Sequence, residues 1–175
     1  MAITNKVTSE RNSTLIGAAG EHYVMSILLR QNLICTLAPV GAPDFDILIT
    51  ERDGKKVSTI QVKTTTGNTG GWQMREKHEK PIAGMFYCFV NFWHETDKLP
   101  ECYIVPSEKV ANILQNDHQS WVNTPAKNGK TRNNGDMRKL CRDHTKNLGS
   151  NTEYCEGWLN KYKNNWDQLR SKKDA

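Results

Sequence analysis

The sequence lacks any run of about 18 apolar residues, so no segment is long enough to cross a membrane as a helix. Residues 1–12 also lack the apolar stretch of a secretory signal. The chain has five cysteines, an odd number, and no two of them form a Cys-x-x-Cys pair. This pattern argues against a disulfide framework and against a zinc knuckle. Together these absences indicate a cytoplasmic protein in a reducing compartment.

Several catalytic motifs are missing as well. Gly129-Lys130-Thr131 imitates the end of a phosphate-binding loop, but Thr124 stands where such a loop needs its first glycine, and no strand precedes it. The five histidines show no ligand spacing, and Cys141 with His144 forms only half of a zinc site. No serine nucleophile elbow occurs. The sequence therefore gives no support to an NTPase, a zinc enzyme or a serine hydrolase.

Positive charge is concentrated in one segment. The chain carries 24 Lys and Arg against 19 Asp and Glu, a formal net charge of +5. Residues 121–150 hold seven of the bases and two of the acids, so the rest of the chain is balanced at seventeen each. A basic segment of this kind attracts a polyanion, most often nucleic acid, through phosphate contacts. The alternative is a solvated loop that is basic for solubility.

A length of 175 residues is typical of one domain with a substantial core. We expect a polar leader over 1–12 and a single domain over 13–175, with a core at 13–117 and a basic loop and C-terminal helices at 118–175. Apolar residues recur at helical spacing from Ile16 to Leu28, which predicts a helix capped by Ser13 or Thr14 and ending near Gln31. The small residues at 17–20 let this helix pack closely against a sheet.

The remaining pattern predicts a mixed α/β sheet flanked by helices. Strands are expected at 34–40, 45–51, 56–65, 84–93 and 102–105, with a short extended piece at 72–75. The second and third strands are joined by a hairpin at 52–55, which contains the Asp-Gly turn signal. Later helices are expected at 107–116, with Ser107 as a cap, and at 136–146 and 153–169, separated from the first by a loop at 118–135.

The hairpin predicts a polar site. The stretch PDFDILI places Asp44 and Asp46 directly before an apolar strand, and the returning strand places Gln61 and Lys63 on one face because side chains alternate. Pairing outward from the turn brings Asp46 close to Gln61 and Lys63. Glu21 borders the apolar stripe of the first helix, so it can join these residues if that helix crosses the same face.

The run GAAGE in the first helix, PDFDILI at a strand start and IQVK in the paired strand resemble the PD-(D/E)xK nuclease superfamily. The form of the motif found here, with a helix glutamate and Gln-x-Lys, is similar to that of Mrr-like restriction enzymes and Holliday-junction resolvases. The match covers about Leu15 to Thr66. The resemblance implies a restriction-endonuclease-like α/β core with a mixed central sheet and, here, a helical C-terminal extension.

The resemblance also implies roles for single residues. Asp46 corresponds to the metal-binding aspartate, with Asp44 as a second candidate; Lys63 corresponds to the motif lysine and Glu21 to the acid of the first helix. Gln61 stands where the family usually has Glu or Asp. It offers a metal only a neutral carbonyl oxygen, so the site loses one negative charge. The implied cofactor is Mg²⁺, with Mn²⁺ as a substitute.

The function expected from these residues is a metal-dependent endonuclease that hydrolyses DNA phosphodiester bonds. Two alternatives stay open: a catalytically inactive nucleic-acid-binding module of the same fold, which the neutral Gln61 favours, and a structural or protein-interaction domain. Many nucleases of this fold act as dimers, so a homodimer is a further expectation. Phosphate contacts are expected from basic residues on both sides of the site: Lys127, Lys130, Arg132, Arg138, Lys139, Arg75 and Lys77.

Overall fold

The computed structural model describes residues 12–170 except 40, 43, 53, 55, 56, 68, 95 and 96. All of the expected leader except Asn12, together with Pro43 and much of the hairpin turn, therefore lies outside the described residues. The helices are α1 (Ser13–Arg30), α2 (Ser107–Asn123), α3 (Thr145–Leu148) and the 3-10 helices η1 (Glu76–Glu79), η2 (Trp158–Tyr162) and η3 (Trp166–Leu169). The strands are β1 (Ile34–Leu37), β2 (Ile47–Thr50), β3 (Val57–Thr66), β4 (Gly71–Arg75), β5 (Met85–Phe92), β6 (Glu101–Pro106) and β7 (Met137–Cys141).

The main sheet has the strand order β1-β2-β3-β5-β6. β3 and β5 are parallel, and the other neighbours are antiparallel, which confirms the expected mixed sheet. β5 is buried along almost its whole length because both of its faces are covered. None of the described helices is long and apolar enough to span a bilayer.

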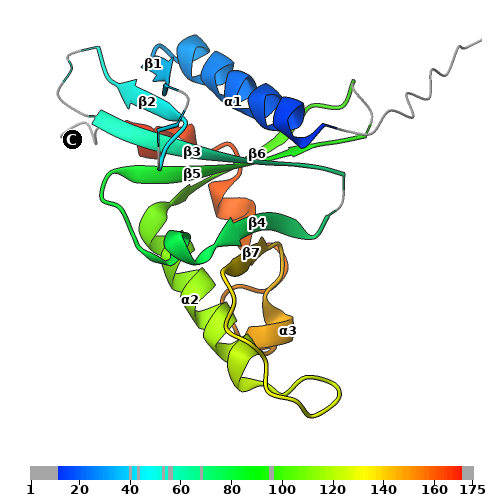
Figure 1. Cartoon of the computed structure of the whole chain (residues 1–175). Coiled ribbons are helices and arrows are strands. Elements are labelled where there is room, and N and C mark those ends of the chain that lie inside the picture. The colour runs from blue at the N-terminus through cyan, green and yellow to red at the C-terminus, as the bar shows by residue number, and fades with distance from the viewer. Residues whose placement is uncertain are drawn as a thin grey trace, which may run out of the picture.

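Different elements cover the two faces of this sheet (Figure 1). α1 lies on one face, where mostly aliphatic side chains pack, among them Leu28, Ile60 and Ile104. The paired strands β4 and β7, together with α2, cover the other face, where the core is rich in aromatic residues such as Trp72 and Phe89. Alternate residues of β5 enter the two cores, as the period of two requires. β3 packs Ile60 and Val62 into the core under α1, and its other face carries Gln61 and Lys63.

α1 approaches β3 closely at one glycine. A Cβ atom on Gly20 would overlap the side-chain hydroxyl of Thr64, so only glycine allows this separation. The expectation that small residues let the helix pack closely is confirmed here. The expected cap is wrong: the side chain of Asn12 accepts the hydrogen bond from the Thr14 N–H, 2.9 Å away, and Ser13 is already helical. The close approach places the next residue, Glu21, beside the sheet.

The C-terminal third differs from the sequence prediction. The helix expected over 136–146 is wrong, because residues 137–141 form β7 and pair with β4, with Trp72 opposite Leu140. The helix expected over 153–169 is also wrong, because Gly157 and Asn164 adopt positive φ angles of 88° and 51° and leave only the short turns η2 and η3.

α2 also differs from its prediction. It runs to Asn123, seven residues beyond the expected end, and occupies the start of the predicted loop. Ser107 does not cap it: this residue is the first of the helix, and its hydroxyl instead accepts a hydrogen bond from the Ile82 N–H at 3.0 Å. The longer helix carries the loop that follows it away from the main sheet, toward the lower end of Figure 1.

Candidate active site

Asp46 is fixed by the β2–β3 hairpin. Its backbone N–H donates to the Ile60 carbonyl at 2.8 Å, and its Oδ2 accepts from the Val62 N–H at 2.7 Å. The register, with Ile47 opposite Ile60, sets Asp46 at the level of Gln61. The structure thus brings Asp46 to the end of the hairpin where the sequence places it. Burial raises the pKa of Asp46, and the Val62 N–H and the Lys63 charge oppose this rise.

Gln61 and Lys63 lie on the same face of β3. Gln61 is only 9 % exposed, and within the described part of the chain its Oε1 has no hydrogen-bond partner although it is buried. An orphaned buried carbonyl oxygen is costly, so it calls for a donor or a cation from outside the protein. Burial lowers the pKa of Lys63, the charge of Asp46 opposes this, and Lys77 and Arg75 reinforce it.

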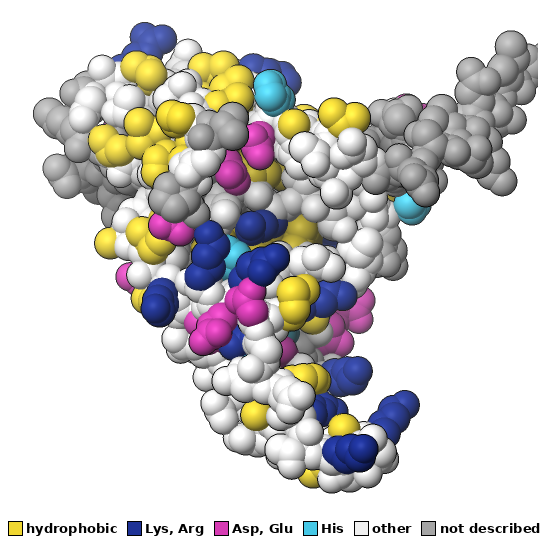
Figure 2. All heavy atoms as spheres, viewed as in Figure 1, with side chains coloured by type: hydrophobic (Ala, Val, Ile, Leu, Met, Phe, Trp, Pro, Cys, Tyr) yellow, Lys and Arg dark blue, Asp and Glu magenta, His cyan; other side chains and the backbone are white. Residues whose placement is uncertain are grey.

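Glu21 reaches the same region from α1. Burial raises the pKa of Glu21, and the negative charge of Asp46 raises it further, so the two carboxylates lie within electrostatic reach of each other. Figure 2 shows acidic side chains in the band just below α1, facing a group of Lys and Arg side chains that surround a histidine. α1, β2 and β3 therefore place Glu21, Asp46, Gln61 and Lys63 around one end of the hairpin.

A pocket of about 330 Å³ opens on the Gln61 side of this group. β4 and η1 form its opposite wall. The side chains that line it are Gln61, Lys63, Gln73, Met74, Arg75, Lys77, His78 and Met137. A second depression of about 390 Å³ adjoins it, shares Lys63 and Gln73, and is bordered by Lys139. Lys63 therefore stands between two hollows that basic residues border.

The basic residues at this pocket are held by acids. Arg75 is paired with Asp136 at 2.7 Å, and Lys77 lies 3.6 Å from Asp44. All four side chains are about half exposed, so the pairs lie at the rim. Asp44 is thus at the rim beside Lys77, while Asp46 is the acid that the hairpin holds.

The other expected phosphate-binding residues divide into two groups. Lys127 and Lys130 are exposed on the loop after α2, where Arg132 donates to the Trp121 carbonyl and lies 4.7 Å from the Trp121 ring centroid. Arg138 differs from these, because its side chain is only 3 % exposed and is paired with Glu79. Its guanidinium is thus held inside the fold by Glu79, away from the exposed lysines of the loop.

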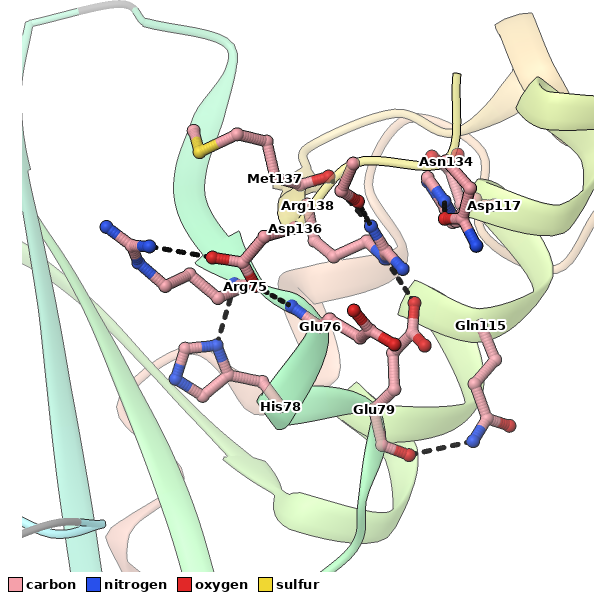
Figure 3. Close-up of polar contacts among 12 residues, drawn as sticks. Arg75, Glu76, His78, Glu79, Gln115, Asp117, Asn134, Asp136, Met137 and Arg138 are labelled. Carbon is pink, nitrogen blue, oxygen red and sulfur yellow. Dashed lines mark hydrogen bonds and ion pairs between the residues drawn. The ribbon is translucent and has the colours of Figure 1, made fainter. Parts of the chain in front are cut away.

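His78 belongs to the pocket but was not singled out from the sequence. It is 4 % exposed, and its Nδ1 accepts a hydrogen bond from the Arg75 N–H at 2.8 Å (Figure 3). No motif spacing in the sequence points to His78, because its position depends on how η1 follows β4 in the folded chain. Only the three-dimensional structure brings it to the wall opposite Gln61.

The residues present fit a hard divalent cation. Asp46 and Glu21 supply carboxylates, and the orphaned Gln61 Oε1 supplies a neutral oxygen. Mg²⁺ is commonly bound by one or two carboxylates and keeps several waters, so this sparse oxygen set suits it. Among the described residues, no cluster of three or more His, Cys, Asp or Glu side chains has the geometry of a metal site. A fully protein-enclosed site is therefore not what this region offers.

Comparison with known proteins bears on the fold. No protein-family model matches the chain, and no curated protein sequence matches it. Its mixed sheet with flanking helices is similar to solved structures of the restriction-endonuclease-like fold, which confirms the expected fold class. The particular structure that supports this is a bacterial homing endonuclease, I-Ssp6803I, with a TM-score of 0.51 and 12 % identity, over 91 % of this chain and 92 % of that one.

Two further solved structures are similar. One is the Holliday junction resolvase Hjc of Archaeoglobus fulgidus, with a TM-score of 0.38 and 12 % identity, over 71 % of this chain and 83 % of that one. The other is a restriction endonuclease in complex with substrate DNA, with a TM-score of 0.42 and 17 % identity, over 81 % of this chain and 71 % of that one. The structural neighbours are nucleases.

Proposed function

We propose that the protein is a metal-dependent endonuclease that hydrolyses DNA phosphodiester bonds. The observation that carries the proposal is the meeting of Asp46, Gln61 and Lys63 at one end of the β2–β3 hairpin, with the Gln61 Oε1 buried and unpartnered among the described residues. A purely structural role gives no reason for an unpartnered buried oxygen on a side chain that lines a pocket with Lys63 and basic neighbours.

Asp46, Glu21 and Gln61 are the residues proposed to hold Mg²⁺, with Mn²⁺ as a substitute. When bound, the cation would neutralise charge on the phosphate and stabilise the departing oxygen. Asp46 is suited to this because the Val62 N–H engages only its Oδ2, at 2.7 Å, and orients the carboxylate. Gln61 contributes no charge, so the site has two carboxylates where three would bind the cation more tightly.

Lys63 is proposed to orient the attacking water and to accept its proton. Burial and the charges of Lys77 and Arg75 favour the neutral amine by lowering the pKa of Lys63. A neutral amine accepts a proton, whereas an ammonium only donates hydrogen bonds. Lys63 lies between the two hollows, so it reaches a water placed in either of them.

DNA is the proposed partner. Arg75, Lys77 and Lys139 border the two hollows, and Lys127 and Lys130 extend the basic surface along the loop after α2. Contacts from such residues set affinity and register with little sequence information.

Cutting both strands of a duplex needs two such sites, so we propose that the protein acts as a homodimer in that reaction. We also propose that it is located in the cytoplasm, because all five cysteines are free.

The test is cleavage of supercoiled, linear, single-stranded and branched DNA with Mg²⁺ or Mn²⁺. Asp46→Asn keeps the shape of the side chain and removes its charge, and Lys63→Met keeps the aliphatic stem and removes the amine. Lys63→Met should lose at least about 100-fold in rate, the scale expected for a lost proton-transfer group. Asp46→Asn should lose at least about as much, because it removes a proposed ligand of the metal. Lys80→Met, at an exposed lysine outside both hollows, should cleave as the wild type does. Cleavage that persists in both site variants would refute the assignment.

The second candidate function is a DNA-binding module that does not cleave. The neutral Gln61 favours it, because a weaker metal site can retain DNA binding without hydrolysis. The same assay separates the two. If the wild-type protein shifts these DNAs in a binding assay but leaves every one of them intact with both metals, the binding module is the correct reading.

A further inference from the structure

His78 is held rigidly at the wall of the 330 Å³ pocket. It belongs to η1, the short turn directly after β4, and its Nδ1 accepts a hydrogen bond from the Arg75 N–H at 2.8 Å. Its ring meets the Tyr87 ring edge to face, with centroids 5.8 Å apart and an interplanar angle of 88°. One backbone bond and one aromatic contact therefore fix both the position and the tilt of the imidazole.

The bond to Arg75 decides which nitrogen carries the proton. A neutral imidazole has one acceptor nitrogen and one N–H, and Nδ1 is the acceptor here, so Nε2 is the donor. The pKa of His78 is lowered to about 4 by burial and by the charges of Lys63 and Lys77, which keeps the ring neutral near pH 7. Figure 3 shows the second ring nitrogen on the far side from the Arg75 bond.

The Nε2–H has no partner among the residues that the structure describes, although it is buried. A buried donor without a partner costs about 1 to 3 kcal/mol, so such a group is normally satisfied by a ligand or water. The neighbours of His78 in the pocket show which ligand is suited. Arg75 and Lys77 supply positive charge, so an anionic acceptor is favoured over a neutral one.

We propose that His78 donates a hydrogen bond from Nε2 to a non-bridging oxygen of a DNA phosphate bound in this pocket, beside Lys63, Arg75 and Lys77. This inference rests on the proposed function, because it specifies how the same site holds its substrate. The contact is directional and uncharged. It positions one phosphate relative to Asp46 and Gln61, whereas the surrounding cations attract the DNA from any direction.

An uncharged donor and a cation differ in their dependence on salt. Each phosphate neutralised by Lys or Arg contributes about −0.9 to the slope of log K against log salt concentration on duplex DNA. Loss of the His78 donor should therefore weaken binding without changing this slope. Loss of charge at Lys77, in Lys77→Gln, should reduce the steepness of the slope by about one. The two measurements separate a positioned hydrogen bond from general attraction.

Two substitutions at position 78 separate the phosphate contact from the structural bond. His78→Asn places an amide oxygen where Nδ1 stands, so it keeps the acceptor for the Arg75 N–H and loses the pocket donor. His78→Gln places an amide nitrogen near the Nε2 position, so it keeps a pocket donor and loses the acceptor. A purely structural role predicts that Asn is tolerated and Gln is not, whereas the phosphate contact predicts the reverse.

The experiment measures DNA affinity by fluorescence anisotropy in Ca²⁺, over a series of salt concentrations. We expect a dissociation constant about 10-fold higher for His78→Asn, with an unchanged salt slope, and less than about 3-fold higher for His78→Gln. Wild-type affinity in His78→Asn, or a salt slope that falls by about one, overturns the inference. A water bound to Nε2 in place of phosphate gives the first of these outcomes.

The results distinguish the inference from the proposed function. If the wild type binds and cleaves DNA but His78→Asn binds equally well, only the phosphate contact fails. If the wild type binds DNA without cleaving it, the nuclease proposal fails, and the affinities of the two variants still decide the role of His78. If the wild type neither binds nor cleaves DNA, both are overturned.

Discussion

The two faces of the main sheet differ in the side chains that pack against them. The face under α1 is filled mostly by aliphatic side chains, and one helix covers it with a glycine at the closest approach. The other face is filled by aromatic side chains and is covered by a small separate sheet and α2. Polar groups follow this division. The first face contributes Glu21, while the second carries Arg75, Lys77 and His78.

The two faces support different parts of the proposed site. The hairpin between the two faces holds Asp46, Gln61 and Lys63, and its position depends on the tight contact with α1. The pocket residues proposed to contact DNA come from elements on the second face. The bond from the Arg75 N–H fixes the buried His78, and ion pairs with Asp136 and Asp44 hold Arg75 and Lys77 at the rim. Damage to the first face should therefore disturb the end of the hairpin that we propose binds the metal, and damage to the second should disturb the wall proposed to contact DNA.

The largest expected effect is on the second face, at Arg138. Its buried guanidinium pairs with Glu79 and donates to the Gly135 carbonyl (Figure 3). Arg138→Met should lower the free energy of unfolding by about 3 to 5 kcal/mol, because the Glu79 carboxylate loses its partner. Urea denaturation measures this. Lys139→Met, one residue along the same strand but exposed, is the matched control and should change stability by less than about 0.5 kcal/mol. Equal effects of the two would contradict the buried pair.

On the first face, Gly20→Ala should cost about 1 to 3 kcal/mol, because the new methyl group overlaps the Thr64 hydroxyl and pushes α1 away from β3. The matched control is Gly17→Ala, where a Cβ meets nothing within 4 Å. That change should stabilise the helix by about 0.5 to 1 kcal/mol. Thermal or urea unfolding of both variants checks the sign as well as the size. A stabilised Gly20→Ala would show that the close approach is absent.

At the hairpin between the faces, Gln61→Glu should tighten Mg²⁺ binding by about 10-fold, because a third carboxylate joins Asp46 and Glu21. Isothermal titration with the metal measures this directly, without DNA. Gln73→Glu adds the same charge to the same pocket from β4 and serves as the control. An unchanged affinity in Gln61→Glu, or an equal gain in the control, would place Gln61 outside the metal site.

The smallest effect at neutral pH is that of His78 ionisation, which contributes only as the solution is acidified. Its folded pKa of about 4 lies below the ordinary value of 6.5, so the unfolded chain binds more protons between these values. This group therefore favours folding above about pH 6.5, and the benefit is lost as the pH falls toward 4. A shift of this size corresponds to a loss of at most about 3 kcal/mol at pH 4. His78→Asn should flatten the pH dependence of unfolding by that amount, and parallel curves for both proteins would argue against a buried neutral imidazole.

The hairpin pairing of Asp46 with Gln61 was predictable because the signals were local. The Asp-Gly signal and the alternation in the third strand predicted the register that is observed, which sets Asp46 at the level of Gln61. The helix glycine and Glu21 followed from helical spacing. His78 was not predictable, because its place at the pocket depends on β4 pairing with β7, some 60 residues later in the chain.

The two helices predicted in the C-terminal third are absent for physical reasons that lie in particular residues. Burial alternates regularly along β7, but the charged Arg138 points inward with Leu140 while the apolar Met137 is exposed. The usual pattern of apolar residues inside and polar residues outside is therefore reversed at these first two positions. Between 153 and 169, Trp158, Leu159 and Trp166 are buried as a helical stripe would predict. The chain buries them in short turns instead, since Gly157 and Asn164 interrupt any continuous helix.

The crossover from β3 to its parallel neighbour β5 contains β4 and η1 where such connections usually carry a helix. Along β4, successive side chains point alternately into the core and toward the pocket. Trp72 and Met74 are buried in the core, while Gln73 and Arg75 face the pocket. Selection can therefore alter the pocket-facing residues one at a time, leaving both the fold and the hairpin chemistry intact. The crossover is thus the segment in which relatives with the same reaction and different substrates would be expected to diverge first.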